Sequence, residues 1–134
     1  MAKESGIGMS IAVDDSGGSA RTISNDITNF DFSTPRNVQV VTGLDKSAEE
    51  RLQLLADFSI TINGVFNDAS NQSHAVFSTV PSSSVARTVT ITVSGQSLPN
   101  ETFFNDYAIT RAATGELTFS APGTLTGGTV PTWA

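Results

Sequence analysis

The sequence predicts a mainly β fold, an antiparallel sandwich or barrel flanked by one short α-helix. Apolar and polar residues alternate in most segments between turns, which is the period of a half-buried strand. Charged residues make up 15% of the chain, below the roughly 25% typical of globular proteins. A single segment has convincing helical spacing. At 134 residues we expect one domain over 1–134, with flexible arms at about 1–6 and 123–134.

The first third of the chain predicts short strands separated by turns. In "GIGMSIAV" every second residue is apolar, and "DDSGGS" then breaks the pattern with turn-forming residues. After a short "ARTIS" strand, "NDITNFDFSTP" places Phe30 and Phe32 on one face. Pro35 ends this strand because proline cannot donate to a ladder. Val38 and Val40 then predict another short strand before a turn at Gly43.

The segment from Ser47 to Leu55 is the predicted helix. Ser47 and Glu50 have the spacing of a capping box, and the first turn is acidic, as the helix dipole favours. Ala48, Leu52 and Leu55 fall on one narrow stripe. A helix this short is marginal alone, so we expect it to be docked on the sandwich.

Four further strands and a second, weaker helix follow. Phe58, Ile60, Ile62 and Phe66 share one face of a strand, whereas "NQSHAVFSTV" predicts a loop with a short helix. "ARTVTITVSG" is the clearest strand, with valine and isoleucine on one side and threonine on the other. "DYAITRAATGELTFSAPG" predicts a hairpin across a glycine-containing loop. In all we expect seven or eight strands.

No residue pattern predicts an enzyme, a cofactor or a metal site. There is no cysteine, and His74 is the only histidine, so a zinc site cannot be assembled and any catalytic triad would have to use His74. Asp14 and Asp15 beside glycines could suggest calcium, but EF-hand spacing is missing and a solvated turn is the simpler interpretation. A formal charge of −6 argues against a nucleic-acid-binding protein. We expect neither a signal peptide nor a membrane anchor.

The chain resembles the major tail (tail tube) proteins of long-tailed siphophages, in the short single-domain form found in phages of actinobacteria. The likeness rests on a collinear series: "MAKESG", "VDDSGG", "ISNDITNFDFSTPRNVQVVTGLDKSAEERLQLLADFSITINGVFN", "HAVF", "RTVTITV", "YAITRAATGELTFSAPG" and "GGTVPTW". It covers nearly the whole chain, although no single motif is diagnostic.

The resemblance implies a virion structural protein that is made in the host cytoplasm and assembled into the tail. Six copies would close into a ring, and stacked rings would form the tube that delivers the genome at ejection. The implied partners are other copies of the chain and the tape-measure, tail terminator and distal tail proteins. Double-stranded DNA would pass through the lumen without specific binding. Six copies carry 6 × 6 = 36 formal negative charges, which would favour sliding of DNA.

Two groups of residues are candidates for the surfaces of such an assembly. For contacts between subunits and stacked rings we expect Asp14, Asp15, Pro35, Arg36, Val38, Val40, Val41 and Trp133; an ordinary edge strand is the alternative for the valines. For the lumen we expect Asp26, Asp31, Asp57 and Asp106, with solvated surface aspartates as the alternative. The strand faces formed by Ser59, Thr61 and Asn63, or by Thr88, Thr90 and Thr92, could line the lumen or join subunits. A small β-sandwich module that binds carbohydrate or protein is the alternative function.

Overall fold

The computed structural model describes residue 3 and residues 5–134, and these fold into ten antiparallel strands and one short α-helix. The strands are β1 (Ser10–Asp14), β2 (Ala20–Thr22), β3 (Ile27–Ser33), β4 (Arg36–Val40), β5 (Arg51–Ala56), β6 (Ser59–Val65), β7 (Arg87–Val93), β8 (Gln96–Phe104), β9 (Ala108–Arg111) and β10 (Leu117–Leu125). The helix α1 spans Ser73–Phe77, and a 3-10 turn spans Ser24–Asp26. The predicted fold class is confirmed. The N-terminal arm expected at 1–6 lies partly outside the described residues.

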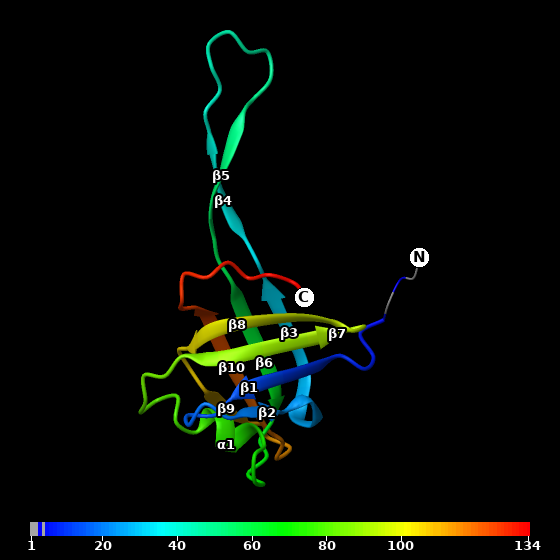
Figure 1. Ribbon diagram of the computed structural model, residues 1–134. Helices are drawn as coiled ribbons and strands as arrows, with labels where there is room; N and C mark the ends of the chain where they lie inside the picture. The colour runs from blue at the N-terminus through cyan, green and yellow to red at the C-terminus, as the bar shows by residue number, and fades with distance from the viewer. Residues whose placement is uncertain (1–2, 4) are drawn as a thin grey trace.

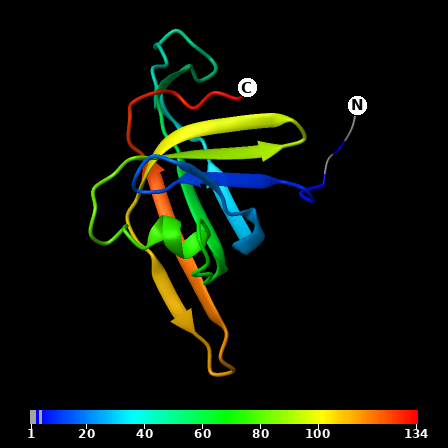
Figure 2. The ribbon, with the colours of Figure 1, turned by 60° about the horizontal axis from the view of Figure 1, so that its bottom comes forward.

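Eight strands form one continuous sheet in the order β2-β1-β7-β8-β10-β6-β3, with β9 beside β10 (Figure 1). The long strand β8 pairs with β7 over most of its length and with β10 only at its end, from Thr102 to Phe104. The sheet therefore folds over at β8 into two layers, which cross in Figure 2. One layer contains β2, β1, β7 and the start of β8, and the other contains β9, β10, β6 and β3.

The core lies between the two layers, as the alternating patterns predict. Phe58, Ile60 and Ile62 are buried from one layer, and residues such as Ile11 and Ile91 are buried from the other. Phe30 and Phe32 both pack against this core while Asp31 between them is exposed. The helix α1 covers one end and inserts Phe77, whose ring lies 5.1 Å from that of Phe104.

The predicted helix over Ser47–Leu55 is wrong. Its second half is strand β5, which pairs with β4 in a separate two-stranded hairpin that projects beyond the body (Figure 1). The Glu50 amide, expected to join a capping box, instead donates to the Thr42 hydroxyl at 2.9 Å. The leucine stripe had no apolar surface to dock on, and "RLQLLA" also fits a strand once β4 supplies a partner. The one α-helix is the weaker candidate in "NQSHAVFSTV".

The C-terminal segment returns along the body rather than leaving it at residue 123. Gly123–Leu125 still belong to β10. Beyond them, the Thr126 amide donates to the Glu101 carbonyl, and Ala134 exchanges two backbone hydrogen bonds with Ser97, of 2.8 and 3.0 Å. These contacts cover the edge of β8 that β10 does not reach.

Candidate inter-subunit surfaces

The β4–β5 hairpin carries the largest group of exposed apolar side chains in the described residues. The exposed fractions are 52% for Val38, 55% for Val40, 53% for Leu52 and 83% for Leu55. Pro35 and Arg36 lie at its base, where the Arg36 guanidinium donates to the Leu54 carbonyl at 2.7 and 3.1 Å. The structure therefore brings five of the predicted contact residues together: Pro35, Arg36, Val38, Val40 and Val41.

Apolar side chains occupy both faces of this hairpin. Val38 lies opposite Gln53 and Val40 opposite Arg51, whereas Leu52 lies opposite Gln39 and so on the other face. Neither face packs on the body, since Val38, Val40 and Leu52 are all exposed. A two-stranded hairpin alone is marginally stable in water, and an exposed apolar patch of this kind marks an interaction site. The hairpin therefore leaves apolar side chains on both of its faces exposed in the single chain.

The turn that follows β1 is organised by Asp15. Its carboxylate accepts hydrogen bonds from the amides of Gly17 and Ser19 at 2.9 and 3.0 Å and forms an ion pair with Arg21. The hydrogen bond from the Ser19 amide is the largest cause that lowers the pKa of Asp15, and Arg21 lowers the pKa further. Asp14 lies at the end of β1, where its carbonyl accepts from Arg87. Both oxygens of the Asp15 carboxylate are therefore used in contacts within the turn.

Two strands of the second layer have an unpaired edge among the described residues. β3 pairs only with β6, and β9 pairs only with β10, so the layer ends in one free edge on each side. Beside the free edge of β3 lies a groove of about 490 Å³, between this strand and the start of β1. Met9, Ile11, Phe30 and Phe32 line it together with polar residues. Free edges of this kind readily pair with another chain.

The four lumen candidates fall in four different environments. Asp26 is 2% exposed, and its carboxylate accepts from the Asn67 side chain at 2.8 Å and the Ser73 amide at 2.9 Å. It is thus a structural anchor for the loop before α1, and a lumen position for Asp26 is excluded. Asp57 lies at the base of the hairpin and Asp106 between β8 and β9, both exposed. Only Asp31 lies on the outer face of a sheet strand.

Trp133 is half-exposed and packs within its own chain. Its ring centroid lies 6.2 Å from that of Phe32, near the base of the hairpin. A contact to another subunit would use only the exposed part of the indole.

His74 belongs to an aromatic cluster and not to a triad. Its Nδ1 lies 3.2 Å from the Tyr107 hydroxyl, and its ring centroid lies 4.6 Å from that of Phe66. Burial is the main cause that raises the pKa of Tyr107, with a smaller effect from the negative charge of Asp26. No serine hydroxyl is among the hydrogen-bond partners of the His74 ring in the described structure.

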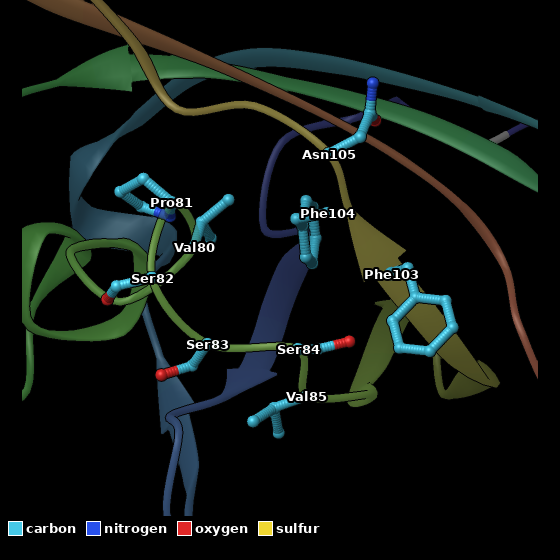
Figure 3. Close-up of a pocket in the computed structure, with 9 residues that line it drawn as sticks. All are labelled: Val80, Pro81, Ser82, Ser83, Ser84, Val85, Phe103, Phe104 and Asn105. Atoms are coloured by element: carbon cyan, nitrogen blue, oxygen red, sulfur yellow. The ribbon is translucent and has the colours of Figure 1, made fainter.

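A cleft of about 440 Å³ lies under the loop that precedes β7 (Figure 3). Its lining comes from residues 80–85 and 103–105 and contains no titratable side chain. In Figure 3 the hydroxyls of Ser82 and Ser83 point away from Phe103, so the polar groups do not converge on one point. Such a cleft supplies no acid, base or activated nucleophile.

Over the described part of the chain, no group of three or more histidine, cysteine, aspartate or glutamate side chains is arranged to hold a metal ion. The same residues include no helix of the length and apolarity needed to cross a membrane.

Sequence patterns missed two features of these surfaces. Strand β8 was not predicted, although Leu98, Asn100, Thr102 and Phe104 alternate inward along it; Pro99 in the same segment masked the pattern. The free edges of β3 and β9 follow from strand order, which local periodicity does not contain.

The fold is shared with chains of gene transfer agent particles. One solved chain, from the virion of a native gene transfer agent particle, has a TM-score of 0.81 and 15% sequence identity, with 98% of this chain and 99% of that chain covered. Another, from the tail of an empty particle refined helically with C6 symmetry, has a TM-score of 0.73 and 19% identity, with 98% of each chain covered. No protein-family model and no curated protein sequence matches the chain.

Proposed function

We propose that this chain is a tail structural protein of a phage-like particle, in which six copies close into a ring and stacked rings form the tail tube. The observation that carries the proposal is a four-stranded layer with two free edges, from which an uncovered apolar hairpin projects. The likeness to a tail chain solved with C6 symmetry supports both the tail assignment and the number of copies.

The directions of the strands allow copies of the chain to pair edge to edge in a ring. In the layer β9-β10-β6-β3 every neighbouring pair is antiparallel, so β3 and β9 run in opposite directions. A rotation about an axis roughly parallel to the strands would bring β3 of one copy beside β9 of the next in antiparallel orientation. Such a head-to-tail contact closes into a ring when the rotation closes.

Stacking would use the hairpin. It extends β3 and β6 beyond the body (Figure 1), and the strand residues Arg36–Val40 alone span roughly 17 Å. A hairpin of this reach can lie against a copy in the neighbouring ring and bury its valine and leucine faces there. Under this proposal Val38, Val40, Val41 and Leu52 are contact residues.

The remaining roles follow from the tube. The protein would be made in the host cytoplasm and reside in the virion tail. The tape-measure, terminator and distal tail proteins would meet the tube in its bore or at its ends, and double-stranded DNA would pass through it at ejection without specific binding. The function is structural and not catalytic.

A hairpin substitution tests the proposal. Val40→Asp should abolish rings and tubes in negative-stain images of concentrated protein, because a carboxylate would be buried in the stacking contact. The matched control is Val130→Asp, at a residue 60% exposed outside the hairpin, which should still assemble. Circular dichroism should show both variants folded. The proposal fails if the unmodified chain stays monomeric at high concentration, even with its tail partners, or if Val40→Asp assembles normally.

A carbohydrate- or protein-binding module is the weaker alternative. Sugar-binding faces present aromatic rings, but Tyr107 is packed in the cluster with His74 and Phe77, and Trp133 lies against Phe32. The strands β3, β6, β9 and β10 present no aromatic side chain on their outer faces, and next to them the exposed Phe103 of β8, opposite Thr124, is a single ring and not an aromatic platform.

A further inference from the structure

The outer face of the β9-β10-β6-β3 layer is almost free of charge. The strand register places Asp31, Thr61 and Pro122 in one row across it, flanked by rows that contain Asn63 and Ser59. The other outward positions of these strands carry serine, threonine, asparagine, alanine or valine. Of the residues within these four strands that point to this face, Asp31 alone is charged, and none is lysine, arginine or histidine.

The one lysine or arginine within these four strands, Arg111, lies on the other side of the layer. Arg111 lies at the end of β9, opposite Leu117. It is two residues after Ile109, which lies opposite the buried Phe119, so Arg111 is on the inner and not the outer face of the strand. Asp26 is buried, and Asp57 and Asp106 are exposed just beyond the strand ends, with Asp57 two residues before Ser59 and its amide bonded to the Pro35 carbonyl. Apart from Asp31, the acidic residues of the chain therefore lie outside the four strands that form this face.

In a ring closed through β3 and β9, this face would point inward. The opposite face of the layer is covered by β2, β1, β7 and β8 and by α1, which are the bulkier part of the body (Figure 2). A ring has more room on its outside than at its bore, so the covered side of the layer fits the outside of the ring. The uncovered outer face of β9, β10, β6 and β3 then borders the bore.

We infer, on the basis of the proposed function, that this face is a neutral hydroxyl and amide lining past which a double-stranded nucleic acid moves because it finds no cationic anchor. Six copies place six Asp31 carboxylates in each ring, one per chain, and not the 36 charges of the whole ring. A few carboxylates repel phosphates weakly beyond a screening length of about 8 Å at physiological salt. Retention of a nucleic acid requires lysine or arginine contacts, and this face lacks them. The expectation of an acidic lumen formed by four aspartates is replaced by a neutral lining with one carboxylate.

The chain offers a matched pair of positions to test where this face lies. Thr61 and Thr90 are both half-buried threonines in central strands, on the two opposite outer faces of the sandwich. Because the chain has no cysteine, Thr61→Cys and Thr90→Cys each introduce a unique thiol. In assembled tubes, a small maleimide should label both, whereas a polyethylene glycol maleimide too large for the bore should label only Thr90→Cys. Equal labelling of both variants by the large reagent would overturn the inference, while imaged tubes would keep the proposed function.

The charge claim is tested with the same pair. Tubes of Thr61→Lys should retain a short DNA duplex at least about tenfold more than unmodified tubes at low salt, in nuclease-protected form, and release it at high salt. Thr90→Lys should retain only nuclease-sensitive duplex on the outside. Asp31→Asn should behave like the unmodified chain. Where Thr61→Lys prevents assembly, Ser120→Lys from the same face replaces it.

Two results would overturn the neutral lining. One is retention of duplex by Asp31→Asn, which would make carboxylate repulsion the cause of free passage. The other is the absence of protected duplex in both lysine variants of the face. Failure of the unmodified chain to form tubes would instead count against the proposed function.

Discussion

At the residue scale, two buried polar side chains hold the α1 region against the sheet. Arg87 is 1% exposed and donates to the carbonyls of Asp14 and Val76 and to the Thr79 hydroxyl, at 2.7 to 3.1 Å. Asp26 binds the Ser73 amide at the start of α1. Because an unpaired buried polar group is costly, each of these residues fixes the groups around it. A five-residue helix with little intrinsic stability is positioned in this way.

Gly64 is a residue whose replacement should destabilise the fold. A Cβ at this position would lie 2.3 Å from the Asp26 carbonyl oxygen and 2.9 Å from the Phe119 ring. Gly64→Ala should lower the free energy of unfolding by about 2 to 3 kcal/mol, because β3 or β10 must shift. The matched control is Gly17→Ala, whose Cβ would meet only the Asp15 carboxylate at 3.4 Å. Chemical denaturation of both variants measures the difference, and equal stabilities would contradict the close approach.

The Asp15 turn should make stability depend on acid. Its lowered folded pKa means that the ionised form is stabilised by folding, chiefly through the Ser19 amide and also through Arg21. This contribution is present above the ordinary pKa of 3.8 and is lost as the pH falls below it through the lowered folded value. Asp15→Asn keeps an acceptor for the amides but loses the charge.

Thermal unfolding from pH 6 down to pH 2 measures this effect. The melting temperature of Asp15→Asn should fall less between pH 4 and pH 2 than that of the unmodified chain. Asp68→Asn, at an exposed aspartate, serves as the control and should leave the pH dependence unchanged. Parallel curves for Asp15→Asn and the unmodified chain would contradict the assignment.

At the element scale, the hairpin differs from the sheet strands that it extends. β6 is paired on both sides and has a buried face, whereas β4 and β5 have only each other. The hairpin is anchored at its base by the Arg36 guanidinium and by the hydrogen bond from the Asp57 amide to the Pro35 carbonyl. Few buried contacts mean a low free energy of local opening.

Hydrogen exchange should therefore separate the hairpin from the body. In the monomer, amides of β4 and β5 should exchange at least about a hundredfold faster than those of β6, because opening them exposes little apolar surface. In assembled tubes the hairpin amides should become protected. The Val40→Asp variant supplies the unassembled control at the same concentration. Slow exchange of the hairpin in a verified monomer would show that it is stable by itself.

At the scale of the whole molecule, the C-terminal segment contacts both layers of the sandwich. Trp133 packs on Phe32 of β3, and Ala134 pairs with Ser97 of β8, so the C-terminal segment links the two layers across the base of the hairpin. The segment therefore ties the end of β3, next to the hairpin base, to β8 in the other layer.

Replacing the tryptophan tests this link. Trp133→Ala should lower the free energy of unfolding by about 1 to 2 kcal/mol, less than a fully buried tryptophan because the side chain is 46% exposed. Trp133→Phe should restore most of the loss, since it keeps the stack on Phe32. In the unmodified chain, Trp133 is the only tryptophan, so its fluorescence should shift to the red as the protein unfolds. An unchanged stability of Trp133→Ala would mean that the segment adds little.

Local sequence pattern determined the mainly β class, most strand positions and the inward-facing residues. Alternation placed Phe30 and Phe32 on one strand face, and Phe58, Ile60 and Ile62 on another, because side-chain direction in a strand reverses at each residue. Both faces pack on the core in the structure. The β9–β10 hairpin was equally visible from its turn. The valine segment was correctly predicted as an exposed strand, which is a local property of residues 36–40.

Only the tertiary structure decided whether "KSAEERLQLLA" forms a helix or a strand. The segment has the residue spacing of a helix and also fits a strand, and in the structure its second half pairs with β4 as a strand. Tertiary structure also decided that Asp26 is buried while Asp31 is on an otherwise uncharged strand face, because facing partners 30 or more residues away set both environments. Alternation tells which residues share a face; strand order tells which face is covered, and that depends on long-range pairing that no local pattern contains.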